Sequence, residues 1–432
     1  MRCKVPGEAI GTAWEERYRP PSVSALYLHV PFCSSKCAYC DFASWVTRAD
    51  DAIMGCYVRS LMAQLDEVAA LGLLDGVRTA YVGGGTPSLL GPTLLGRLVS
   101  RVRELCPELV ELSCEANPES LSDELLCALV QSGATRVSMG VQSLDDAELA
   151  ALGRAHTADV ALKRLEAAVA SGLDVSCDLM CAIPLQTRQG WLRSLEGVAS
   201  LGVAHVSVYP LSIEEGTALA RRVGDAVPTW NDSDVQAVRM REAQDFLGSR
   251  GLSRYEVASY ARPGRECRHN LCYWTGRAYF GLGTGASSML TCAGYGLLRS
   301  ACPQLPPAPD GCRRVRLRVR SGRREICDGQ GISALSFDLE FLTLRQAVAE
   351  DLMLGARLMS GVSPRLLALA REVMGPAAVD GCVREVTDMG LARSDATGAL
   401  VPTEQGWLLG NELYGALWEL SEGDVLVASS PA

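Results

Sequence analysis

The sequence has no long apolar run, no excess of positive charge and only four histidines. A helix that crosses a bilayer needs about 20 consecutive apolar residues, and without such a run we expect a chain that does not span a membrane. The N-terminus lacks the apolar core of a secretory signal, so a cytoplasmic protein is expected. The net charge of −9 argues against nucleic acid as a partner, because phosphate binding needs a basic surface.

Apolar residues and cysteines are plentiful. Hydrophobic residues make up 48% of the 432 positions, which suffices for a large core and for two or three domains. The 17 cysteines are expected to be mostly reduced thiols, because a chain of this length needs no covalent staples. Free cysteine packs as a small apolar side chain, so core positions are expected for Cys106, Cys127, Cys177 and Cys382.

Short β-branched runs alternate with longer amphipathic stretches from residue 25 to about 210. Strands are predicted at 25–30, 77–82, 110–115, 135–141, 173–180 and 203–209, with helices near 50–71, 92–105, 121–132, 158–171 and 189–201. This alternation is typical of parallel β/α units, in an open doubly wound sheet or in a barrel. In both folds ligands bind at the carboxyl ends of the strands.

Polar or glycine-rich residues end all six predicted strands. They are the three-cysteine loop after 25–30, GGGTP (83–87), CEANP (114–118), GVQS (140–143), Asp178 and YPL (209–211). Since parallel strands end at one rim, these residues predict an active-site face. A pure interaction module is the least expected function, because it has no need for such convergence.

Beyond residue 230 the pattern changes. A helix is predicted near 233–250, a strand at 253–261, a linker at 301–312 and helices over 343–415. RVRLRVR (314–320) has the period of a half-buried strand, either a solvated edge strand protected by its charges or a binding site for phosphate or propionate. The expected division is an N-terminal extension (1–24), a barrel (25–250), a middle region (251–335) and a C-terminal helical domain (336–432).

Cys33, Cys37 and Cys40 have the spacing C-x₃-C-x₂-C. The cysteine content would give roughly 0.03 occurrences of this spacing by chance. A structural zinc ion or a permanent electron-transfer cluster normally has four protein ligands. Three thiolates therefore predict a metal centre with one position left open for a small molecule.

The stretches HVPFCSSKCAYC and VGGGTPSLL resemble the radical S-adenosylmethionine (SAM) proteins. With CEANPE, VSMGVQSLDDAELAALGRAH, DLM and HNLCYW, the chain is similar to the HemW haem chaperones and the related oxygen-independent coproporphyrinogen III dehydrogenases. The resemblance implies an α/β fold, namely a partial (β/α)6 barrel with a smaller, mostly helical, winged-helix-like C-terminal domain. It also implies a [4Fe-4S] cluster on Cys33, Cys37 and Cys40, with SAM on the fourth iron.

The same resemblance implies a set of SAM contacts: Tyr27, Gly84, Gly85, Thr86, Glu115, Gln142, Arg154 and Asp178. Taken singly, Glu115 or Asp178 could instead cap a strand end, and Arg154 could form a surface ion pair. One departure follows Asp178, where Cys181-Ala182-Ile183-Pro184 replaces the usual GLP turn. If that turn needs a positive φ, Ala182 is strained.

Two features favour a haem carrier over a dehydrogenase. The related dehydrogenases resemble C-x₃-C-x₂-C-x-C, with an extra cysteine two residues after the third, and here Phe42 occupies that position. The stretch HNLCYW (269–274) also matches the chaperones. Within this stretch His269, Cys272 and Tyr273 are of residue types that ligate haem iron, and aromatic rings such as Trp274 pack on a porphyrin. His269 is the candidate haem ligand; its alternative is a hydrogen-bonded core histidine.

The function expected from these residues is binding of haem, a [4Fe-4S] cluster and SAM, with transfer of haem to an acceptor such as a respiratory, membrane-associated haem protein. Coproporphyrinogen III oxidase activity is not expected. The alternatives are that same oxidative decarboxylation by a radical SAM enzyme, and a radical SAM protein that degrades or methylates haem. Whether SAM is cleaved stays open.

Overall fold

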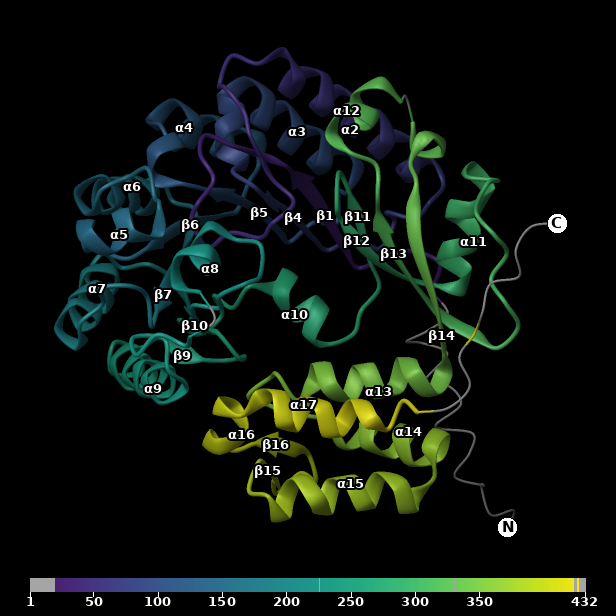
Figure 1. Ribbon diagram of the computed structural model, residues 1–432. Coiled ribbons are helices and arrows are strands. Elements are labelled where there is room, and N and C mark those ends of the chain that lie inside the picture. Colours follow the sequence, from purple (N-terminus) through teal and green to yellow (C-terminus); the bar gives the residue numbers. More distant parts are fainter. Residues whose placement is uncertain (1–19, 225, 330, 423–425, 427–432) are drawn as a thin grey trace, which may run out of the picture.

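The computed structural model describes residues 20–224, 226–329, 331–422 and 426, and one large curved sheet dominates it (Figure 1). The six predicted strands lie within two residues of their expected places and run parallel in chain order. They are β1 (Ala25–Val30), β4 (Thr79–Gly84), β5 (Glu111–Ala116), β6 (Arg136–Gln142), β7 (Asp174–Cys181) and β8 (His205–Pro210). The sheet ends at β14 on one side and β9 on the other, so the expected partial barrel is confirmed.

Helices return the chain between these strands along the convex side of the sheet (Figure 1). They are α2 (Ala52–Ala70), α3 (Gly91–Leu105), α4 (Asp123–Ser132), α5 (Asp146–Leu152), α6 (Ala158–Ala170) and α7 (Arg188–Ser200). Capping residues define where these helices begin and end. In α4, for example, the Ser122 hydroxyl accepts the Leu125 N–H and Gly133 closes the helix at φ +89°, a position that suits glycine.

Alternation along the strands separates an apolar convex face from a polar concave face. In β5, Leu112 and Cys114 pack in the main core, whereas Glu111 and Glu115 point the other way because side chains alternate along a strand. Such carboxylates tolerate burial only with hydrogen-bond partners. The concave face is therefore where ligand chemistry can be placed.

Further strands extend the sheet on both sides. On one side β11 (Tyr279–Leu282) pairs with β1 in parallel, followed by antiparallel β12 (Ser287–Thr291), β13 (Cys312–Val319) and β14 (Phe337–Thr343). On the other side lie β10 (Ser259–Ala261) and β9 (Ser253–Arg254). The prediction of one strand at 253–261 is wrong, because residues 255–258 form the turn of this hairpin.

The arginine-rich segment is a strand, as predicted, but the interpretation as a solvated edge strand is wrong. β13 lies between β12 and β14, and Val315, Leu317 and Val319 are at most 2% exposed. On its other face Arg314 pairs with Glu350 and Asp351. Arg314 is thus partnered inside the sheet rather than protecting an edge.

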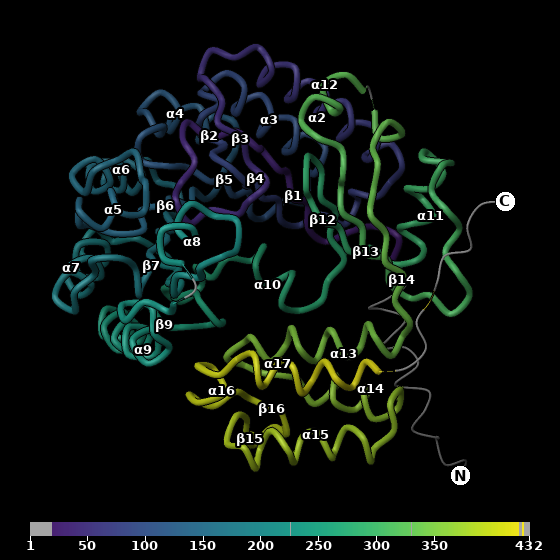
Figure 2. Tube along the Cα trace, in the orientation of Figure 1, coloured from purple at the N-terminus to yellow at the C-terminus, as the bar shows by residue number. Residues whose placement is uncertain are grey.

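A short helix, α10 (Arg268–Trp274), lies on the concave side of the sheet, between the strands and α13 (Leu344–Gly355), as Figures 1 and 2 both show. The Glu111 carboxylate of β5 accepts the N–H groups of Arg268 and His269. An anion at a helix start satisfies free donors. This contact holds the start of α10 against β5.

The C-terminal part has its own apolar core. Residues from α13, α14 (Pro364–Met374), α15 (Pro376–Asp388) and α17 (Gly410–Glu419) form it, and α16 (Glu404–Leu408) and the hairpin of β15 (Ala392–Ser394) and β16 (Leu400–Pro402) complete the unit. The mostly helical C-terminal part is thus confirmed. The domain boundaries remain predictions, and residues 1–19 of the expected N-terminal extension lie outside the described residues.

The remaining elements are β2 (Phe32–Cys33), β3 (Trp45–Val46), α8 (Ala218–Val223), α9 (Ser233–Ser249), α11 (Cys292–Ala301) and α12 (Arg323–Asp328). Cys106, Cys177 and Cys382 are buried as expected, but Cys127 is exposed on α4, so that expectation was wrong. In the described part of the chain no helix combines the length and hydropathy of a membrane span.

Candidate functional site

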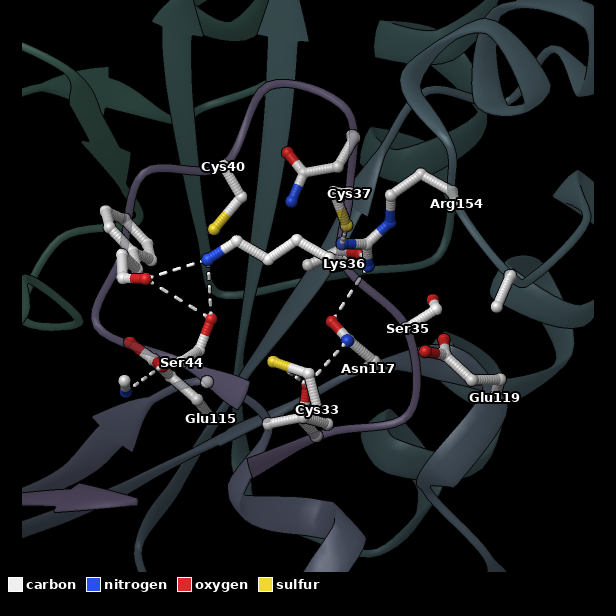
Figure 3. A pocket seen from close by; sticks show the side chains of 18 of the residues that line it. Cys33, Ser35, Lys36, Cys37, Cys40, Ser44, Glu115, Asn117, Glu119 and Arg154 are labelled. Carbon is white, nitrogen blue, oxygen red and sulfur yellow. Dashed lines mark hydrogen bonds between the residues drawn. The ribbon is translucent and has the colours of Figure 1, made fainter. Parts of the chain in front are cut away.

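Three cysteines converge on one pocket at the carboxyl ends of the parallel strands. Cys33 ends β2, and Cys37 and Cys40 lie in the loop from β2 to β3; Figure 3 shows all three beside the same hollow, whose volume is about 140 Å³. The Lys36 ammonium braces this loop by donating to the Phe42 carbonyl (2.8 Å) and to Ser44 Oγ (3.0 Å).

Two of the thiols receive hydrogen bonds. Arg154 Nη1 lies 3.4 Å from Cys37 Sγ, and Thr86 Oγ1 lies 3.6 Å from Cys33 Sγ. A cationic donor favours the thiolate, which is the metal-binding form. In the described part of the chain no three His, Cys, Asp or Glu side chains stand close enough for one metal ion. An iron–sulfur cluster has a separate iron for each thiolate, and three cysteines lining one pocket fit this requirement.

Most of the residues predicted to contact SAM line this pocket. Gly84, Gly85, Thr86, Glu115, Gln142, Arg154 and Asp178 do, together with the three cysteines. Tyr27 does not; it lines a neighbouring cavity. The rim expected from the strand ends is therefore a real cluster of side chains drawn from β4, β5, β6 and β7.

Glycine is needed in the GGGTP stretch for close packing as well as for ligand access. Gly84 has φ +119°, and a Cβ there would lie 2.5 Å from the His29 ring. A Cβ at Gly85 would lie 2.7 Å from the Phe32 carbonyl and 3.0 Å from Cys33 Sγ. Because any side chain would push the cysteine loop away, these glycines set how near the thiols lie to the sheet.

Two carboxyl groups face the pocket. Glu115 Oε2 accepts the Gly84 N–H at 2.8 Å, and burial raises the pKa of Glu115 to about 7. Asp178 Oδ2 accepts from Ser138 Oγ at 3.3 Å, and burial raises the pKa of Asp178 to about 6. Each group loses hydration in the fold, so each favours a ligand that donates hydrogen bonds or carries positive charge.

Arg154 is not a surface ion pair. Its side chain enters the pocket, where Nη2 donates to Asn117 Oδ1 (2.8 Å) and to the Gly140 carbonyl (2.7 Å). With Nη1 directed at Cys37, the guanidinium joins β5, β6 and the cysteine loop. That alternative interpretation of Arg154 is therefore excluded.

The residue-level predictions missed several pocket residues, chiefly Lys36, Tyr39, Asn117, Glu119 and Ser138. Asn117 lies inside the CEANP stretch, and Ser138 points to the concave face by simple alternation along β6, so both signals were available. Lys36 and Tyr39 lie between the cysteines, where spacing alone says nothing of direction.

The turn after β7 carries the predicted strain. Ala182 has φ +53°, which costs an L residue about 1–2 kcal/mol. Its N–H is held by Gln186 Oε1 (2.9 Å), and its carbonyl accepts from Asn231 Nδ2 (2.8 Å). Gln142, beside the pocket at a bulge of β6, also has a positive φ, of +68°.

A larger cavity of about 640 Å³ adjoins the thiol pocket and shares Phe42, Gly84 and Glu115 with it. Aromatic and apolar side chains form much of its wall: Tyr27, Phe42, Tyr273, Trp274, Tyr279, Met289 and Leu354. A volume of this size and lining is typical of a site for an organic ligand.

His269 does not line this cavity. It is 1% exposed, its Nδ1 lies 3.2 Å from Thr79 Oγ1, and its Nε2 lies 2.9 Å from Tyr273 Oη. Burial lowers its pKa to about 3, so the ring is neutral. The geometry therefore matches the alternative interpretation of His269, a hydrogen-bonded core histidine. Of the three candidate haem donors, only Tyr273 lines the cavity.

Comparison with known proteins agrees with this arrangement. The model of the Radical SAM superfamily matches residues 27–196. A protein of Mycobacterium tuberculosis named "Heme chaperone HemW" is 41% identical over 272 residues, which cover 62% of this chain and 70% of that protein. The chain belongs to the HemW family of radical SAM proteins.

Other relatives extend this family assignment. The HemW protein of Lactococcus lactis is 33% identical over 306 residues, covering 70% of this chain and 79% of its own. The solved structure of the radical SAM coproporphyrinogen III oxidase HemN from Escherichia coli has the same fold, with a TM-score of 0.71 over 96% of this chain and 93% of that one, at 20% identity. Membership of the radical SAM superfamily implies a [4Fe-4S] cluster and SAM, and the thiol pocket has the residues to hold both.

Proposed function

We propose that this protein is a haem carrier that binds haem in the 640 Å³ cavity and passes it to an acceptor protein. The observation that carries the proposal is the position of this aromatic cavity, which shares a wall with the thiol pocket in a chain of the HemW family. Tyr273, Trp274 and Tyr279 can pack against a flat apolar macrocycle.

In this proposal Cys33, Cys37 and Cys40 hold a [4Fe-4S] cluster, and the glycine-rich stretch with Glu115, Arg154 and Asp178 holds SAM. The cluster, when bound, would supply electrons and an open iron position. The residues around it do the positioning: Arg154 orients the loop of Cys37, and Glu115 receives a donor of the ligand. Tyr27 would then contact SAM from the side of the cavity.

The iron ligand is a separate question. His269 stays a prediction, because ligation would require its ring to leave Thr79 and Tyr273. Tyr273 already lines the cavity, and its phenol lies 2.9 Å from His269 Nε2. Phenolate ligation of haem iron is known chemistry, and a hydrogen bond from His269 would then hold the phenol in place.

Titration of the full-length protein, carrying a reconstituted cluster, with haem tests the proposal. We expect a saturable change in the haem absorbance bands. The variant W274A should bind about tenfold more weakly, whereas W418A, which removes a tryptophan on α17 away from the cavity, should bind as the parent does. Equal weakening in both variants would contradict the cavity as the site.

Two further variants separate the possible iron ligands. If His269 is the ligand, H269A abolishes haem binding while cluster absorbance is intact, and Y273F keeps the parent spectrum. If Tyr273 is the ligand, Y273F changes the haem spectrum and H269A weakens binding without changing the spectral class. Thermal melting of each variant excludes a general loss of structure.

The dehydrogenase alternative is tested by incubating the protein with coproporphyrinogen III, SAM and a reductant. We expect no protoporphyrinogen IX, and its formation would replace the carrier proposal by the enzyme. Assay of 5′-deoxyadenosine in the same samples shows whether SAM is cleaved. Recovery of unaltered haem after incubation with SAM and reductant would argue against haem degradation or methylation.

A further inference from the structure

One arginine on the concave face of the sheet has no acidic partner among the described residues. Along β13, Arg314 pairs with Glu350 and Asp351, Arg316 with Glu340 and Glu350, and Arg320 with Asp338. Arg318 lies between them in the same row and is exposed, without an ion pair or hydrogen bond to any residue of the described chain.

Arg318 also lines the 640 Å³ cavity and is the one arginine or lysine among its lining residues. The three acidic groups of the cavity wall form no ion pair with Arg318. Glu350 is held by two other arginines, Glu115 accepts the Gly84 N–H, and Asp41 lies next to Cys40 in the loop from β2 to β3. β13 lies three strands from β1, so Arg318 is roughly 14 Å from the strand that carries Tyr27. The cavity thus has a cluster-facing end, an aromatic middle and a cationic end.

We propose that Arg318 binds a carboxylate of the ligand and thereby selects macrocycles with free propionate groups over neutral ones. This inference rests on the proposed haem site. A guanidinium presents paired donors that match a carboxylate, and the aromatic wall leads to it from the cluster side. The flat apolar part of the ligand would cover Trp274 and Tyr279 while its acidic edge meets Arg318.

The test is an equilibrium titration of cluster-reconstituted, full-length protein with haem and with haem dimethyl ester. We expect R318A to bind haem about tenfold more weakly and R318K to lie between R318A and the parent, because a point charge lacks the paired donors. The ester should bind the parent as weakly as haem binds R318A, and R318A should not weaken it further. R320A, which removes the neighbouring paired arginine, is the matched control and should bind haem as the parent does.

The possible failures are distinguishable. Haem binding by R318A equal to that of the parent overturns the role of Arg318 and leaves the proposed function standing. An equal loss of haem and ester affinity in R318A also overturns it, since the arginine would then act through the shape of the wall. Absence of saturable haem binding by the parent itself overturns the proposed function and this inference together.

Discussion

The two halves of the large sheet are built on different rules. In the half from β1 to β8, the side chains of the thiol pocket come from the carboxyl ends of parallel strands. The half from β11 to β14 pairs mostly antiparallel, and residues within its strands and on α10 complete a wall of the larger cavity that begins at Tyr27, Gly84 and Glu115 of the first half. The position of the thiol pocket follows from the topology of the parallel strands alone. The wall of the larger cavity depends also on which strands and helices pack beside one another.

The comparison predicts that the halves can be damaged separately, and the largest effect is expected at the cysteines. C37A should lose the cluster, with its visible absorbance and bound iron, because one of three thiolates is missing. Haem binding in the neighbouring cavity should persist. C127A, which removes an exposed cysteine of α4, is the control and should retain full iron; loss of haem binding in C37A would show that the halves are not independent.

A second effect is expected in the antiparallel half. Arg314 is 3% exposed and shared by Glu350 and Asp351, so R314M leaves buried carboxylates short of their cation. The unfolding free energy should fall by about 3 kcal/mol, measured by chemical denaturation. R320M breaks an exposed pair with Asp338 and should cost less than about 1 kcal/mol; equal costs would mean that burial does not distinguish them.

The parallel half should show a pH dependence of its own. Burial raises the pKa of Glu115 to about 7 and that of Asp178 to about 6, so between about pH 4 and 7 the folded state holds more protons than the unfolded state. The unfolding free energy of cluster-free protein should therefore decrease as the pH rises through this window.

The double variant E115Q/D178N tests this dependence. Both replacements remove a titrating group, so the decrease with rising pH should flatten and the protein should become more stable near pH 7. E412Q, at an exposed glutamate of α17, should keep the parent profile. An unchanged profile in the double variant would locate the pH dependence elsewhere in the chain.

The smallest effect is expected at the turn after β7. A182G removes the strain of φ +53°, about 1–2 kcal/mol, but loses one buried methyl group, about 0.8 kcal/mol, and adds backbone freedom to the unfolded chain, about 0.5–1 kcal/mol. The unfolding free energy should therefore change by less than about 1 kcal/mol. A80G, in β4 with ordinary backbone angles, has no strain to relieve and should lose between about 1 and 2 kcal/mol. Equal losses in the two variants would contradict the strain at Ala182.

The sequence was informative where function follows from strand order. Six strands, the cysteine loop, the glycine-rich stretch and Glu115 lie where the pattern predicted, because alternation and chain order decide them, whereas Arg154 was expected from the family resemblance alone. The larger cavity could not be derived in this way. Its wall needs β13 beside β12 and α10 on the concave face, which are contacts between segments far apart in the chain.

His269 and the arginine strand show the same limit. The residue types of HNLCYW suggested a ligand, but the direction of each side chain depends on how α10 sits over β4. Likewise, alternation predicted a strand at 314–320, while its interior place and its acidic partners on β14 and α13 are tertiary facts. Tyr27 was assigned to one pocket and lies in the wall of the next, a difference set by packing on Tyr81.

The single carboxylate of Glu115 borders both hollows, and this gives the molecule a thermodynamic constraint. If filling one hollow alters the charge or orientation of Glu115, the affinity of the other changes by a fixed factor, and the reverse effect must have the same size. The dissociation constant of haem measured with and without SAM therefore also gives the change in SAM affinity caused by haem, without a second experiment.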